Sequence, residues 1–171
     1  MATNGTPIIL KDRAQALAHY PHGRIANGMI YVSGISSRRL DNTYEGVKEN
    51  ADGTFELDIK SQTKAVIEKY GSIASFTESL QRIANHPLLP DLSLPSSQNS
   101  INVILQSKGA SLANIVDMTI FLTNMKDYGA MNQVYNEYFD AETGPSRTCV
   151  GVLTLPSPKL LIEIKAIALA P

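Results

Sequence analysis

Residues 144–168 read GPSRTCVGVLTLPSPKLLIEIKAIA and contain two β-rich runs. The runs Arg147–Leu155 and Leu160–Ala168 flank Pro156-Ser-Pro158. Proline has no backbone N–H for a sheet ladder, so the Pro-Ser-Pro segment marks a connection between strands. The sequence therefore predicts two strands at the end of the chain.

Alternation along these strands places Arg147 and Cys149 on one face, opposite the more apolar face of Thr148 and Val150. An arginine in such a run needs an anionic partner or contact with water. Arg147 is therefore either a bidentate carboxylate anchor or part of a surface or interface salt bridge. Cys149 is either a small buried hydrophobic residue or a nucleophile.

Glu163 shares one face of the last strand with Lys165. It is either a general acid or base, or the solvated side of a half-buried strand.

Working outward, the pattern predicts a strand, a polar hairpin or loop, and three helical segments around another strand. These are the strand at 28–34, the loop at 38–54, helices at 58–70, 101–108 and 127–139, and the strand at 115–123. Asp58 is the expected N-cap of the first helix and Gly109 the expected left-handed end of the second. The order indicates an α+β sandwich with helices on one face of a sheet. The N-terminal stretch with His19 and His22 is expected to be flexible.

Residues 70–100 are predicted to be an insertion within a single domain spanning 1–171. The serine- and proline-rich second half of this segment has no helical or strand period. Without these 31 residues, the flanking half-helices share one apolar stripe at spacings of 4, 3, 4 and 3, formed by Ile59, Thr63, Val66, Ile101 and Ile104. The segment is either a retained in-frame intron or a real excursion with a short helix near 75–85 and poor order over 86–100.

Composition excludes several classes of protein. The 171 residues are 43% hydrophobic and carry a net charge of -1, which is typical of a globular domain and does not favour nucleic-acid binding. One cysteine excludes an internal disulfide framework, and no histidine pair has metal-ligand spacing. No apolar run is long enough for a membrane span. We expect a cytoplasmic protein, with the mitochondrion as the alternative.

Several ordered motifs resemble the RidA (YjgF) family. They include Gly144–Pro156 and Leu161–Ala168, with Ile30–Gly34 and Asn124–Phe139 upstream. The resemblance covers about residues 18–69 and 101–170. Three further blocks look most like the 2-aminomuconate deaminase branch, namely Ser33–Arg39, Tyr44–Gly46 and Asp58–Glu68.

The resemblance implies a chorismate-mutase-like α+β fold, a mixed sheet with two main helices on one face, of which the first is interrupted by the insertion. It also implies a homotrimer with ligand sites between subunits. It implies hydrolysis of an enamine or imine acid to a ketone and ammonia, without metal or organic cofactor. Arg147 matches the arginine that binds the substrate carboxylate, and Glu163 the carboxylate near the hydrolytic water. The other matching substrate-binding positions are Tyr20, Ser33, Asn132 and Cys149.

Three functions follow as hypotheses. The first is a deaminase of 2-aminomuconate, a dicarboxylate whose distal carboxylate Arg38 or Arg39 would bind. The second is a general deaminase of reactive 2-iminoacids and enamines. The third is a non-catalytic trimer that binds small acids.

Overall fold

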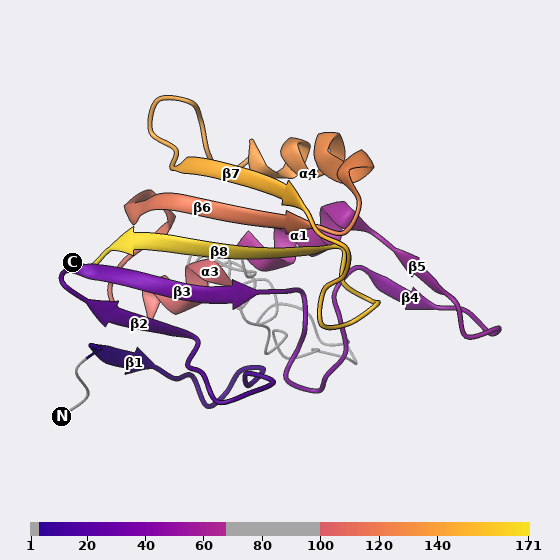
Figure 1. The fold of residues 1–171 in the computed structure, drawn as a ribbon, viewed down its shortest axis with the longest axis horizontal. Helices are drawn as coiled ribbons and strands as arrows, with labels where there is room; N and C mark the ends of the chain where they lie inside the picture. Colours follow the sequence, from indigo (N-terminus) through magenta and orange to yellow (C-terminus); the bar gives the residue numbers. More distant parts are fainter. Residues whose placement is uncertain (1–3, 68–99) are drawn as a thin grey trace, which may run out of the picture.

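The computed structural model of the chain describes residues 4–67 and 100–171. Its main feature is a six-stranded sheet in the order β1-β2-β3-β8-β6-β7 (Figure 1). The strands are β1 (Thr6–Ile8), β2 (Gly23–Ala26), β3 (Met29–Ile35), β6 (Ile115–Leu122), β7 (Ser146–Gly151) and β8 (Ile162–Leu169). Neighbours are antiparallel except β6 and β7, so the sheet is mixed, as predicted.

Three helices lie together behind this sheet in Figure 1. They are α1 (Ile59–Ile67), α3 (Ile101–Gln106) and α4 (Tyr128–Tyr135), accompanied by 3₁₀ turns at Leu112–Asn114 and Met125–Asp127. The predicted polar hairpin is a separate two-stranded ribbon of β4 (Val47–Glu49) and β5 (Phe55–Leu57). The α+β class with helices on one face is confirmed.

The helix ends follow the expected capping chemistry. Asp58 Oδ1 accepts a hydrogen bond from the Lys60 N–H at 2.9 Å, and Ser100 Oγ accepts one from Val103 at 3.3 Å. Side-chain oxygens at these positions satisfy N–H groups that have no partner within the helix. Gly109 has φ +76°, the left-handed conformation predicted after the second helical segment.

The expectation of a flexible N-terminal stretch is wrong for the described residues. β1 and β2 join the sheet, and His22 is buried. Its Nδ1 accepts from the Leu10 N–H at 3.2 Å, so Nε2 carries the proton and donates to the Ala14 carbonyl at 3.0 Å. Strands of three and four residues are too short to show a period, and they are recognised only by the pairing of β1 with β2 and of β2 with β3.

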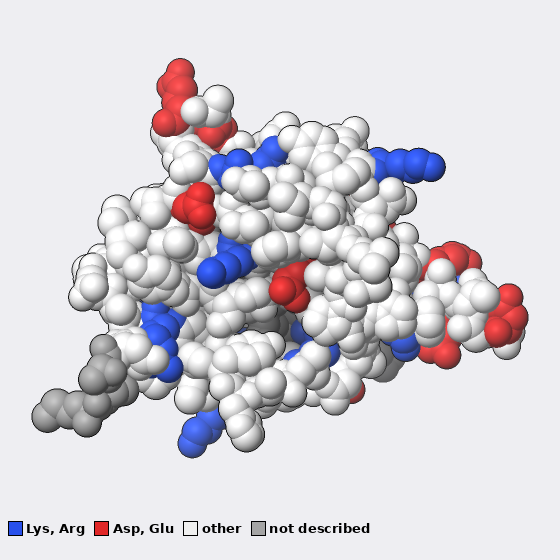
Figure 2. Space-filling model, viewed as in Figure 1, with Lys and Arg blue, Asp and Glu red and all other residues white. Residues whose placement is uncertain are grey.

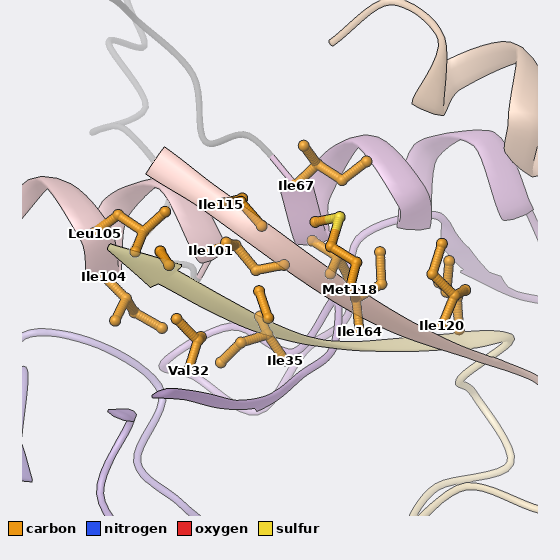
Figure 3. Packing of buried hydrophobic residues seen from close by; sticks show 14 of the residues in the cluster. Val32, Ile35, Ile67, Ile101, Ile104, Leu105, Ile115, Met118, Ile120 and Ile164 are labelled. Atoms are coloured by element: carbon orange, nitrogen blue, oxygen red, sulfur yellow. The ribbon is translucent and has the colours of Figure 1, made fainter. Parts of the chain in front are cut away.

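The apolar core lies between the helices and the rear face of β3, β6 and β8 (Figure 3). All five residues of the predicted stripe, Ile59, Thr63, Val66, Ile101 and Ile104, are buried. α1 and α3 contact each other on this face. The helix predicted near 75–85 and the segment at 86–99 lie outside the described residues.

The opposite face of the sheet carries no helix (Figure 1). Figure 2 views this face, which is largely uncharged with a few scattered charged groups and a recess near its centre. Tyr31, Val150 and Leu169 are among its exposed side chains. Val150 thus lies on the uncovered face of β7, and Arg147 lies on the face covered by α4.

Candidate functional site

All of the predicted site residues except Arg39 fall into two groups, and the key side chains of these groups lie on opposite faces of the sheet. Met118 of β6 is in register with Arg147, and Phe121 of β6 is in register with Glu163. Met118 and Phe121 are three residues apart, so their side chains point to opposite faces. Arg147 and Glu163 therefore lie on opposite faces of one chain, two strands apart.

The first group, here called the arginine cluster, consists of Tyr128, Asn132, Tyr135, Arg147 and Cys149. Arg147 Nη1 donates to Asn132 Oδ1 at 2.7 Å, and Nη2 donates to the Tyr128 hydroxyl at 3.0 Å. The guanidinium carbon lies 4.5 Å from the ring centroid of Tyr135 and 5.7 Å from that of Tyr128. These contacts hold the planar group through two hydrogen bonds and two cation–π interactions.

The partners of Arg147 are neutral. Among the described residues, no carboxylate forms a salt bridge with it. A guanidinium has five N–H donors, so three remain after the bonds to Asn132 and Tyr128. The cluster thus presents an oriented cation that matches the geometry of a carboxylate.

Burial raises the pKa of the Cys149 thiol, and nearby Arg147 opposes this rise. Burial also raises the pKa of the Tyr135 hydroxyl, again with Arg147 in opposition. Both groups therefore stay protonated near neutral pH. The structure favours Cys149 as a half-buried neutral side chain over Cys149 as a thiolate nucleophile.

The second group, here called the glutamate cavity, surrounds a cavity of about 60 Å³ at the ends of β3 and β8. Its walls include Tyr20, Ser33, Arg38, Tyr44 and Glu163. Ser33 Oγ donates to the Pro21 carbonyl at 2.7 Å, so its oxygen can still accept a hydrogen bond.

Glu163 is half-buried, and burial raises the pKa of its carboxyl. In residues 4–67 and 100–171, no hydrogen-bond donor contacts this carboxyl to favour its charged form. Gly34 permits the arrangement, because a Cβ there would collide with the Glu163 carboxyl group. A carboxyl in this environment accepts a proton more readily than an exposed carboxyl does.

Arg38 and Arg39 have different environments. Arg38 lines the glutamate cavity, where it donates to Asn42 Oδ1 at 2.7 Å and to the Gln15 carbonyl. Arg39 is not among the lining residues and forms an ion pair with Glu45. Only Arg38 combines a place in the cavity wall with neutral partners.

Gln62 fixes the segment that leads into Glu163. Its side chain is fully buried, with Nε2 donating to the Lys159 carbonyl at 2.8 Å and Oε1 accepting from the Leu161 N–H at 2.9 Å. The same segment is held from the hairpin, where Lys159 Nζ lies 4.4 Å from the Phe55 ring centroid. Two separate elements thus position the start of β8.

Sequence reasoning missed Tyr128, Tyr135, Tyr44 and Gln62 as site residues. The tyrosines of α4 appeared only as members of an amphipathic helix. Tyr128 lies 19 residues and Tyr135 lies 12 residues before Arg147, and this spacing gave no sign of contact. A polar Gln62 beside the apolar stripe was the one available signal, because a buried amide requires partners.

Within the described ranges, no group of three His, Cys, Asp or Glu residues lies close enough to hold a metal ion. None of the helices described is long and apolar enough to cross a membrane.

Known proteins resemble this chain in sequence. A family model described as Endoribonuclease L-PSP matches residues 95–170. A RutC family protein of Synechocystis is 40% identical over 72 residues, which cover 42% of this chain and 55% of that protein. The putative reactive intermediate deaminase TdcF of Escherichia coli is 38% identical over 74 residues, which cover 42% of this chain and 57% of TdcF. The chain spans about half the length of these curated relatives.

Solved structures resemble it over almost the whole chain. Yeast Mmf1 is 26% identical with a TM-score of 0.58, covering 97% of this chain and 98% of that one. The structure of E. coli TdcF with bound serine has a TM-score of 0.61 at 24% identity, and the match covers 97% of this chain and 100% of that one. The fold is that of RidA (YjgF) structures, and the sequence matches support the RidA resemblance. They do not single out its 2-aminomuconate deaminase branch.

Proposed function

We propose that this protein is a hydrolytic deaminase of small enamine or imine acids. The observation that carries the proposal is Arg147, a cation oriented by Asn132 and Tyr128 and lacking a carboxylate partner among the described residues. The name of the similar protein TdcF, a putative reactive intermediate deaminase, supports the reaction class.

The proposed active site forms between copies of the chain in a homotrimer. Arg147 and Glu163 lie on opposite faces of one sheet, so a single copy does not bring them together. The glutamate cavity of about 60 Å³ is also small beside the roughly 300–1,000 Å³ of ordinary ligand pockets. Apposition of the arginine cluster of one copy and the glutamate cavity of another would complete and enclose the site.

The proposed reaction begins when the enamine takes up a proton on carbon and becomes an iminium ion, the protonated form of the imine. Arg147 holds the carboxylate next to the reacting carbon, which reduces the entropy cost of reaching the reactive geometry. Glu163, directly or through a water molecule, orients water and accepts one of its protons as the oxygen attacks the imine carbon. That proton passes to the nitrogen, the new hydroxyl group gives its proton to the Glu163 carboxylate as the C–N bond breaks, and a ketone and ammonia leave.

Glu163 suits this exchange of protons because burial raises the pKa of its carboxyl toward the working pH. A carboxylate with a raised pKa is a stronger base than an exposed one, so it takes a proton from water more readily.

Within this class, 2-aminomuconate is the substrate we propose. It carries two carboxylates, and Arg38 supplies a second cation with neutral partners in the glutamate cavity. A general deaminase of 2-iminoacids is the alternative, since one carboxylate needs only Arg147. Binding without turnover is a further candidate, favoured by the structure of TdcF with bound serine.

The test is an ammonia-release assay on 2-aminomuconate and on 2-iminopropionate, with the full chain and with a version lacking residues 70–100. The proposed function predicts ammonia from both substrates above the uncatalysed rate, with the larger kcat/KM for 2-aminomuconate. A larger kcat/KM for 2-iminopropionate would favour the general deaminase. Binding without ammonia release from either version would favour the non-catalytic function.

A further inference from the structure

We infer that the Tyr128 hydroxyl is a second donor to the carboxylate that Arg147 binds, and so helps to select carboxylate ligands. The inference rests on the proposed function for its substrate, but its geometry comes from the arginine cluster alone. It assigns a direct ligand contact to a residue that sequence reasoning treated as part of the apolar face of a helix.

The hydrogen bonds of Tyr128 leave its proton available. A phenolic hydroxyl has one O–H donor and can accept hydrogen bonds through its lone pairs. Arg147 Nη2 donates to this oxygen at 3.0 Å, and guanidinium nitrogens cannot accept. The Tyr128 proton therefore points away from Arg147, and no acceptor for it is found among the described residues.

Access to this proton is open. Tyr128 is 38% exposed, whereas its neighbour in the cluster, Tyr135, is 8% exposed. Asn132 on the next turn of α4 holds Nη1 of Arg147, so the guanidinium is fixed from two positions on one helix. The remaining N–H groups of Arg147 and the O–H of Tyr128 can then bind the two oxygens of one carboxylate.

The charge of Arg147 strengthens this donor. A hydroxyl that accepts a hydrogen bond from a cation is polarised, which makes its own O–H a better donor. Both oxygens of a carboxylate accept hydrogen bonds, so a carboxylate matches the N–H groups of Arg147 and the O–H of Tyr128. A carboxamide would place its own N–H₂ donor against one of these donors. The pair of residues should thus discriminate acids from their amides more strongly than an arginine alone.

Tyr128→Phe removes the hydroxyl and keeps the ring that lies beside Arg147. We expect KM for the carboxylate substrate to rise about tenfold with kcat within about twofold of wild type, since one hydrogen bond to a charged group is lost. Tyr138→Phe, in the segment just after α4, is the matched control and should leave both constants unchanged.

Serine binding, measured by isothermal titration against serinamide, tests the inference without turnover. Tyr128→Phe should raise the Kd for serine about tenfold and reduce the preference for serine over serinamide. The same substitution in an Arg147→Lys background separates a direct contact from an effect through Arg147. A direct contact predicts a further loss of serine affinity in that background.

The outcomes are distinguishable. If wild type binds serine but releases no ammonia, the proposed function fails, and the serine titrations still decide the role of Tyr128. An unchanged Kd in Tyr128→Phe, no further loss in the Arg147→Lys background, or no serine binding by wild type would each overturn the inference.

Discussion

The arginine cluster and the glutamate cavity place their key side chains by opposite means. Arg147 is held by two hydrogen bonds and two aromatic rings, all contributed by α4. Glu163 is placed by its backbone and by space at Gly34, and no hydrogen-bond donor among the described residues contacts its carboxyl. The difference suggests distinct tasks, because a fixed cation orients a ligand and an unpartnered, half-buried carboxyl exchanges protons.

The largest effect should come from the arginine cluster. Arg147→Ala removes the charge and the donors that bind the carboxylate, so we expect kcat/KM for ammonia release to fall about 1,000-fold or more. Circular dichroism and light scattering should show an unchanged fold and oligomeric state, because Arg147 is only partly buried on an edge strand. Activity near the wild-type level would contradict the anchor role.

The glutamate cavity should contribute mainly to the chemical step. Glu163→Gln keeps the shape of the side chain and removes proton transfer, so kcat should fall about 100-fold with little change in KM. Steady-state ammonia release separates the two constants. Glu137→Gln alters an exposed carboxylate and serves as the control. A rise in KM with unchanged kcat would instead assign Glu163 to binding, as in the arginine cluster.

Arg38 tests whether the cavity also binds a ligand charge. Arg38→Ala should raise KM about tenfold for 2-aminomuconate and much less for 2-iminopropionate, since only the first has a distal carboxylate. Arg39→Ala is the control, because the Arg39–Glu45 ion pair lies outside the cavity lining. Equal effects of Arg38→Ala on both substrates would exclude a distal carboxylate contact.

The smallest expected effect is on how the free energy of unfolding depends on pH through Glu163. Burial raises the pKa of Glu163 in the folded chain, so the unfolded chain ionises first and the folded state loses stability as the pH rises from the ordinary carboxyl pKa to the raised one. Relative to wild type, Glu163→Gln should therefore gain stability between about pH 4 and pH 7. Urea unfolding at both values measures this difference. A constant difference at the two pH values would mean that burial does not perturb the group.

Much of the fold could be predicted from local patterns. The strand predicted at 28–34, the helix after Asp58 and the two final strands all have clear periods or caps. Each of their predicted ends that falls among the described residues lies within a few residues of the observed end. β1 and β2 could not be predicted because each is too short to show a period. The family resemblance pointed to three residues of the arginine cluster, Arg147, Asn132 and Cys149. It did not point to Tyr128 or Tyr135.

The sequence by itself determined the α+β class, the buried stripe and the candidate groups Arg147 and Glu163, because periodicity, capping and motif order are local properties. Only the tertiary structure decided which groups meet. The parallel pairing of β6 with β7 and the antiparallel pairing of β6 with β8 put Arg147 and Glu163 on opposite faces. The tertiary structure also decided that Arg38, and not Arg39, lines the glutamate cavity. Neighbouring arginines look alike in a sequence, and their partners lie on segments that come together only when the chain folds.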